Sequence, residues 1–170
     1  MNKSFGLAVI ATVFSVSVAH ASDWVARNVT AKGGSNVGIG TTSIGEIEDR
    51  TGNIPAELTI NCSQGATTVF VTSKLTSFGR DDVPLEYTTD GGGIQKARWD
   101  ICDDRNCAGL WNDSGIRFIR SLFGKSMLHM TLYRRVGEPL SAKFPIAGAK
   151  EAILPIAVAC GWLPKNTMDK

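Results

Sequence analysis

The four cysteines, Cys62, Cys102, Cys107 and Cys160, constrain the fold of this 170-residue chain more than any other feature of its sequence. Three pairings are formally possible, and the spacing favours one of them. Cys102 and Cys107 bracket a polar turn, Asp-Asp-Arg-Asn, that can bring their sulfurs together. Cys62 and Cys160 then remain for each other, and their bond would tie an early strand to the last element. We therefore predict a small fold stapled by two disulfides.

The first residues have the three parts of a secretory signal peptide. Lys3 supplies a positive charge, an apolar run follows from Phe5 to Val18, and Ala19-His20-Ala21 ends the segment with small residues. We predict that residues 1–21 are the signal peptide and residues 22–170 one domain. The apolar run is too short for a membrane-spanning helix, which needs about 20 residues. We therefore expect a periplasmic or secreted protein with no stable membrane span after cleavage, in a compartment that lets cysteines pair.

Charge gives no sign of a nucleic-acid partner. Removing the leader takes one cation, Lys3, from the 18 Lys and Arg, which leaves 17 against 16 Asp and Glu. A nearly neutral chain lacks the broad positive field that attracts a phosphate backbone. We therefore expect a protein partner and no nucleic acid.

Most of the mature chain has the pattern of short antiparallel strands. Residues 24–47 predict two strands joined at Lys32-Gly33-Gly34-Ser35, because β-branched residues are frequent and glycines interrupt any helical stripe. The acidic residues and glycines from Gly45 to Pro55 predict a solvated loop. Alternation of apolar and polar residues then predicts strands at 58–62, 67–72, 84–87, 97–101, 127–134 and 140–144.

Two later segments have the helical period. Asn112-Asp113-Ser114 can cap a helix over about 114–124 that ends at Gly124. Its predicted buried face consists of Ile116, Ile119, Leu122 and Phe123. A second helix is predicted over about 148–160, and Pro155 inside it predicts a bend or two short pieces. Strands followed by helices indicate an α+β fold with a mostly antiparallel sheet.

The mature sequence offers few groups for catalysis. His129 is its only histidine, and it alternates with Leu128 and Met130 in a predicted strand without a recognisable partner motif. The four residues between Cys102 and Cys107 fit neither a zinc knuckle nor a thioredoxin-like redox pair. We therefore predict no enzyme, no metal site and no cofactor. A cell-wall hydrolase is the alternative from another class, and it would need an acid and a base.

Aromatic residues and arginine are the better sign of a binding surface, because they combine contact area with directional hydrogen bonds. The candidates for exposed contact residues are Trp111, which precedes Asn112 and Asp113, and the pair Arg134 and Arg135 at the end of a strand. At least two of the four tryptophans are expected to fill the core instead.

From about Leu58 to Trp162 the sequence resembles the type VI secretion system-associated VasI/TagO family. The resemblance rests on a series of motifs in order: Leu58-Thr59-Ile60-Asn61-Cys62, Trp99, Phe118-Ile119-Arg120-Ser121-Leu122, Met130-Thr131-Leu132-Tyr133, Ala142 to Gly148, and Ala159-Cys160-Gly161-Trp162. It implies a non-enzymatic periplasmic accessory of a contractile secretion apparatus in a Gram-negative bacterium, and it would explain the pairing of Cys62 with Cys160. The Cys102 and Cys107 pair and Thr88 depart from the family pattern. The alternative is a periplasmic or secreted inhibitor or envelope-binding module.

Overall fold

The computed structural model describes residues 24–30, 37–49, 52–75, 77–79 and 82–163. The predicted signal peptide and the predicted turn at residues 32–35 lie outside these ranges. Nine strands and two helices occur within them. In chain order they are β1 (Trp24–Thr30), β2 (Val37–Asp49), β3 (Gly52–Ser63), β4 (Ala66–Thr72), β5 (Val83–Thr89), β6 (Gln95–Ile101), β7 (Cys107–Trp111), α1 (Asn112–Ser121), β8 (Met127–Leu132), β9 (Leu140–Pro145) and α2 (Ala149–Ala159).

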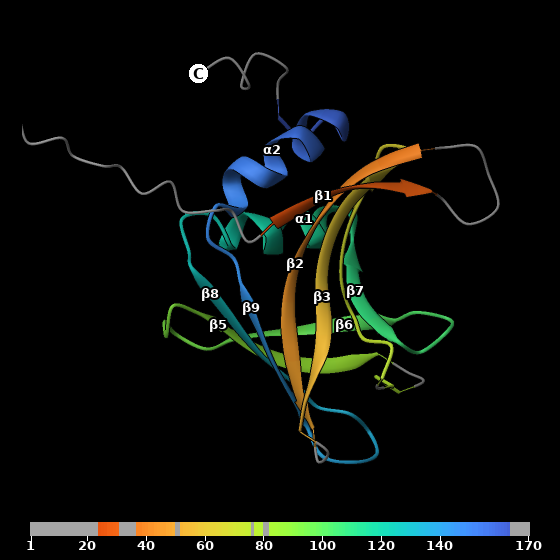
Figure 1. Cartoon of the computed structure of the whole chain (residues 1–170), viewed down its shortest axis with the longest axis vertical. Helices are drawn as coiled ribbons and strands as arrows, with labels where there is room; N and C mark the ends of the chain where they lie inside the picture. Colours follow the sequence, from red (N-terminus) through yellow and green to blue (C-terminus); the bar gives the residue numbers. More distant parts are fainter. Residues whose placement is uncertain (1–23, 31–36, 50–51, 76, 80–81, 164–170) are drawn as a thin grey trace, which may run out of the picture.

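Eight of these strands close into an antiparallel barrel (Figure 1). Their order around the ring is β2-β3-β4-β7-β6-β5-β8-β9, and β9 pairs with β2 to close it. One edge of β2 is shared between two partners, because residues 37–43 pair with β1 and residues 46–48 pair with β9. The mostly antiparallel α+β prediction is therefore confirmed, with the sheet closed on itself so that its ring has no free edge.

The change of partner along β2 occurs at Gly45. A Cβ atom at this position would overlap the carbonyl oxygen of Lys143 and the ring of Phe144, both on β9. Glycine lets the two strands approach each other there, and any larger residue would force them apart. The closing seam of the barrel therefore depends on the absence of a side chain at Gly45.

The predicted loop from Gly45 to Pro55 is wrong, because β2 and β3 run through it as one long hairpin. Their pairing continues to Asp49 opposite Gly52. Ile47 is fully buried, whereas Glu46 and Glu48 on either side of it are not. The carboxylates that suggested a loop occupy the outer side of a strand, where water solvates them.

The strands predicted from Leu58 onward agree with β3, β4, β5, β6, β8 and β9. β7 is not among the predicted strands, because its five residues include Ala108 and Gly109 and lack a β-branched residue. A Cβ atom at Gly109 would lie 2.7 Å from the Cβ of Phe70 on β4. The close approach of β4 and β7 therefore requires a glycine at position 109. The same glycine lowers the strand propensity of the segment, so residue preferences do not predict β7.

Both helices are present, and each differs from its prediction in one respect. α1 begins and ends earlier than predicted, and Phe118 joins Ile119 and Leu122 on its buried face while Ile116 is half-buried. α2 is one continuous helix, so the predicted division into two short pieces at Pro155 is wrong. Pro155 has no backbone N–H, so the carbonyl of Glu151 has no hydrogen-bond donor within the helix. Both residues are exposed, and water can therefore solvate that carbonyl. Neither helix of the described ranges has the length and apolarity needed to span a membrane.

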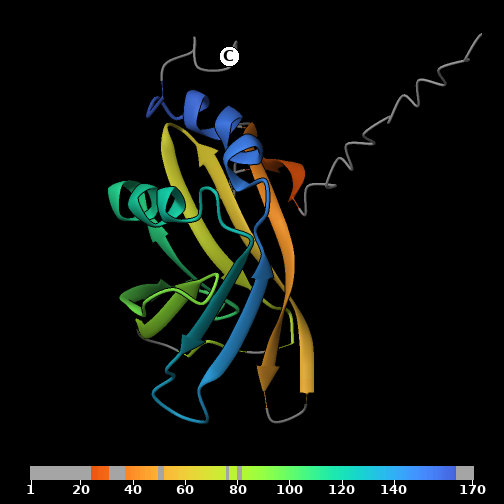
Figure 2. The same ribbon diagram turned by 90° about the vertical axis from the view of Figure 1, so that its left-hand side faces the viewer.

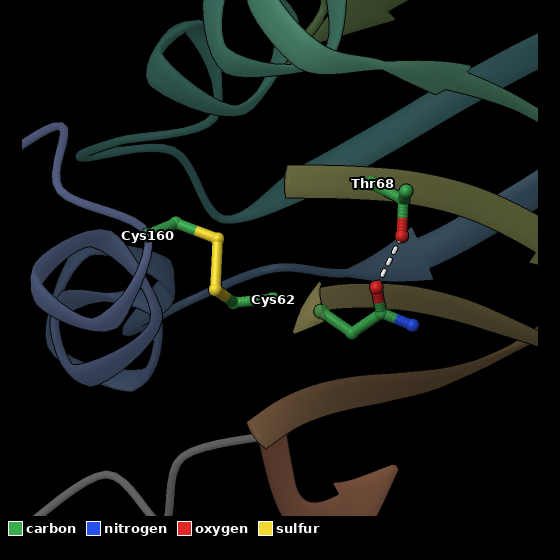
Figure 3. The surroundings of a disulfide bond; sticks show 4 residues. Cys62, Thr68 and Cys160 are labelled. Atoms are coloured by element: carbon green, nitrogen blue, oxygen red, sulfur yellow. Dashed lines mark hydrogen bonds between the residues drawn. A yellow bond between two sulfur atoms is a disulfide. The ribbon is translucent and has the colours of Figure 1, made fainter. Parts of the chain in front are cut away.

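The two ends of the barrel are closed differently (Figure 2). α2 lies across one end, and the bond between Cys62 and Cys160 fastens it to β3, with a Cα–Cα distance of 5.7 Å (Figure 3). At the other end the loop after β4 buries Phe78, whose N–H donates to the carbonyl of Arg105 at 2.9 Å. Cys102 and Cys107 form the second disulfide in the turn that contains Arg105. Both predicted pairings are confirmed.

Asp90 fastens the turn between β5 and β6 to the start of β8. Its Oδ1 accepts hydrogen bonds from the backbone N–H groups of Ser126 and Met127, each at 2.9 Å. These two bonds hold the pKa of the Asp90 carboxyl below its ordinary value, and the bond from Ser126 has the larger effect. A carboxyl with a lowered pKa stabilises the fold above its unfolded-state pKa, and this contribution disappears as pH falls through the folded-state pKa.

We therefore expect the stability of the wild-type protein to fall below about pH 4 more steeply than that of Asp90→Asn, which keeps the oxygen acceptor without the charge. Urea unfolding midpoints measured from neutral to acid pH test this difference. Asp103→Asn, at an exposed position in the disulfide turn, is the control for loss of one negative charge. Parallel pH profiles for wild type and Asp90→Asn would contradict the prediction.

Candidate binding surface

Strand register divides the outer wall of the barrel into two chemically different halves. Outward positions on β5, β6, β8 and β9 alternate with buried ones and include charged or titratable residues. These are Glu86, Lys96, Arg98, Asp100, His129 and Lys143. On the opposite half, two rows of outward residues across β2, β3, β4 and β7 contain no charged residue. We call their larger members the threonine face: Thr42, Thr59, Asn61, Thr68, Phe70 and Trp111.

Polar side chains of the threonine face bond to one another rather than to water. The hydroxyls of Thr42 and Thr59 lie 3.0 Å apart in a hydrogen bond. The Thr68 hydroxyl donates to the side-chain oxygen of Asn61, and Figure 3 shows this bond beside the Cys62–Cys160 disulfide. Thr42, Thr59 and Asn61 are buried although they lie on the outer side of the sheet. The exposed part of the threonine face therefore comes from Thr68, Phe70 and Trp111.

Larger apolar side chains stand around these buried polar groups. Trp111 is 38% exposed, Ile44 on β2 is 47% exposed and Val25 on β1 is 50% exposed. Val25 lies opposite Thr42 in the strand pairing, so it extends the same row onto β1. A partner can cover such a surface without removing water from a charge, and aromatic residues without charged neighbours are typical of interface cores.

A hollow of about 400 Å³ adjoins the threonine face next to Ile44. Its lining residues are Ile44, Pro55, Ala56, Glu57, Thr72, Ser73, Lys74 and Leu75. Leu75 is 69% exposed, which is unusual for a large aliphatic side chain without a partner. Ile44 also lines a second hollow of about 370 Å³ at the seam between β2 and β9. Charged residues line both hollows, Glu57 and Lys74 in the first and Glu46 and Lys143 in the second, so the uncharged area ends where they begin.

The comparisons with known proteins identify a similar fold and no matching family. No protein-family model matches the sequence, and no curated protein matches it. Among solved structures, a crystal structure of invasion associated protein B from Bartonella henselae is similar, with a TM-score of 0.54 and 11% sequence identity. The two proteins share a fold. The likeness covers 83% of this chain and 95% of that chain, so it includes nearly the whole of the other structure.

The predicted contact residues lie at opposite ends of the barrel. Trp111 ends β7 and precedes α1, on the threonine face. Arg134 and Arg135 lie in the connection between β8 and β9, at the end away from α2 (Figures 1 and 2). Arg134 donates to the carbonyl of Glu138 through Nε at 3.1 Å and Nη2 at 2.8 Å, and through Nη1 to the carbonyl of Ser77 at 3.3 Å. Its guanidinium therefore holds two loops together.

Residues with catalytic or metal-binding chemistry are spread over the fold. His129 is exposed on β8, opposite Thr88 on one side and Lys143 on the other. One group in the described ranges, Cys102 with Asp104 and Cys107, has three ligand atoms within 4.8 Å of one another. Both of its sulfurs are used in the disulfide, so neither is a thiolate that could bind a metal.

A polar network on the charged half joins three strands. The hydroxyl of Tyr133, which directly follows β8, donates to Glu86 on β5 at 3.0 Å, and Lys96 on β6 lies 3.2 Å from the same carboxylate. The bond from Tyr133 and then that from Lys96 lower the pKa of Glu86, and the same bond to Glu86 raises the pKa of Tyr133. Because these groups are exposed, the network adds little to stability and serves to order the outer side chains.

Proposed function

We propose that this protein is an exported, non-enzymatic binding domain that acts by contact with another protein. The observation that carries the proposal is the threonine face, an uncharged area on one half of the barrel wall whose polar atoms already bond to one another. The partner is a folded protein with an uncharged, partly apolar patch, because a charged patch would lose its hydration there without finding an opposite charge.

An exported location is supported by both disulfides. Such bonds form and persist in oxidising compartments outside the cytoplasm. The signal-peptide pattern of residues 1–21 points to the same route. We propose the periplasm as the site of action, with secretion from the cell as the alternative.

The identity of the partner is proposed from the sequence resemblance. The motifs from Leu58 to Trp162 that resemble the VasI/TagO family support a component of a type VI secretion apparatus as the partner. The structural neighbour, by its name an invasion associated protein, shares the fold alone, and a secreted inhibitor or envelope-binding module is the alternative proposal. The chemical identity of the captured partner separates the two.

We expect Trp111→Ala and Val25→Asp each to weaken binding to that partner at least about tenfold, because truncating a central aromatic contact or burying a charge costs about 2 kcal/mol or more. The partner is first captured from periplasmic extract by cross-linking to the mature wild-type protein and identified by mass spectrometry. Its dissociation constant is then measured with purified proteins.

Val136→Asp is the matched control, because Val136 is 85% exposed in the connection between β8 and β9. It introduces the same charge at the opposite end of the barrel, and we expect it to bind as the wild type does. Wild-type affinity in both Trp111→Ala and Val25→Asp would contradict the assignment of the threonine face. Equal weakening by Val25→Asp and Val136→Asp, with wild-type affinity in Trp111→Ala, would show that binding depends on net charge and not on this surface.

A further inference from the structure

A separate cavity lies where β6 and β7 part. These strands pair at only two positions, Asp100 opposite Gly109 and Ile101 opposite Ala108, before β7 leads into α1. The cavity between α1 and β6 has a volume of about 310 Å³. It is lined by Tyr87, Lys96, Ala97, Arg98, Leu110, Ser114, Arg117 and Phe118. The site lies apart from the threonine face, on residues that the proposed protein contact does not use.

The charges that line this cavity have one sign. Lys96, Arg98 and Arg117 are the charged residues among the lining, and none of the lining residues is acidic; the register of β6 directs Lys96 and Arg98 to the outer face of the strand, whereas Arg117 lies on α1. Two of the cations have carboxylate partners outside the lining, since Lys96 lies 3.2 Å from Glu86 and Arg98 lies 2.6 Å from Asp82. Within the described residues Arg117 makes one hydrogen bond, from Nη2 to the hydroxyl of Ser114 at 3.3 Å. Its charge therefore has no counter-ion there.

Part of the cavity surface is apolar. Ala97 and Leu110 contribute aliphatic surface, and the ring of Phe118 packs edge-on against Tyr87 at a centroid distance of 5.0 Å. Ring contacts of this kind fix the side chains, so the apolar part is formed before any ligand arrives. A single bare oxyanion would fill only a small part of the space.

We infer that this cavity binds a small organic carboxylate in which the anionic group is attached to a compact apolar body. The guanidinium of Arg117, which lines the cavity, matches the two oxygens of a carboxylate. The apolar body would lie against Phe118 and Leu110. The first turn of α1 adds unpaired N–H groups near Ser114, because the helix has no side-chain cap.

Benzoate is a suitable probe because it combines the two features, and acetate and benzyl alcohol each carry one of them. In a titration of the mature protein followed by NMR, we expect benzoate to shift the Arg117 Nε–H and Ser114 amide signals saturably. Benzyl alcohol should leave them unshifted, and acetate should bind at least about tenfold more weakly than benzoate. Raising the salt concentration should weaken benzoate binding.

Arg117→Gln should weaken benzoate binding at least about tenfold, since it removes the charge from an exposed helix position without emptying the core. Arg105→Gln, at an exposed position in the disulfide turn, is the matched control and should bind as the wild type does. The inference is overturned if benzoate produces no saturable shift or binds Arg117→Gln as tightly as wild type. Equal affinity for acetate and benzoate would overturn the apolar part of the site.

Discussion

Replacing Cys62 and Cys160 together by alanine is expected to lower the free energy of unfolding by about 4 to 5 kcal/mol. Their bond spans a sequence separation of 98 residues, and the chain entropy that a cross-link removes from the unfolded state grows with the length of the closed loop. The same bond holds α2 across one end of the barrel. The measurement is urea unfolding of the oxidised mature protein at neutral pH.

The second disulfide is the matched control for this prediction. Cys102 and Cys107 have a sequence separation of only 5, so replacing both by alanine should cost only about 2 kcal/mol. Each double variant retains one intact bridge and loses two sulfurs. Equal losses of stability in the two variants would mean that loop length does not govern the effect and would contradict the proposed role of the longer bridge.

Trp99→Ala is expected to lower the free energy of unfolding by about 3 to 5 kcal/mol, because it leaves a large cavity in the barrel interior. Trp99 is fully buried, and its ring packs edge-on against Phe118 with a centroid distance of 5.1 Å. The variant therefore loses apolar burial on β6 and the ring contact that seats α1. Urea unfolding followed by circular dichroism measures the change without relying on tryptophan fluorescence.

Two further variants show whether volume causes that loss. Trp99→Phe keeps an aromatic ring, and the indole N–H that it removes has no hydrogen-bond partner in the described part of the chain, so we expect a cost below about 1.5 kcal/mol. Trp111→Ala deletes a tryptophan that is partly exposed, and should cost less than about 1 kcal/mol. A similar loss at Trp99 and Trp111 would contradict the burial that distinguishes them.

Local sequence patterns predict individual strands of this fold and do not predict how the strands close. Leu58, Ile60 and Cys62 alternate with polar residues, and that alternation is sufficient to place β3. Closure depends on the pairing of β2 with β9, which brings Glu46 beside Lys143 from a distant part of the chain. No local pattern specifies such a contact, because it depends on the register of every strand between them.

The candidate binding surface is partly predictable for the same reason. Trp111 is predicted from its residue type and its place directly before Asn112 and Asp113. The threonines are not, because a threonine in a strand suggests solvent exposure until its partner is known. Thr42 and Thr59 become neighbours only through the pairing of β2 with β3, and their shared hydrogen bond removes both hydroxyls from solvent.

Arg134 shows the opposite error of residue-based reasoning. A pair of arginines at the end of a strand suggests a charged contact surface. In the fold, the guanidinium of Arg134 is directed at carbonyl groups of Ser77 and Glu138, so its donors serve the connection between two loops. Residue type gives the bonding capacity of a side chain, and only the tertiary structure shows where that capacity is used.

The division of the barrel wall also limits the stoichiometry of any complex formed through it. The two uncharged rows lie on one side of a closed ring, so a partner bound there leaves the charged outward positions of β5, β6, β8 and β9 facing water. A molecule with one binding face can form a closed pair with its partner. It lacks the second, differently placed interface that a growing filament requires. Complexes built on the threonine face should therefore remain discrete, with one partner for each molecule of this protein.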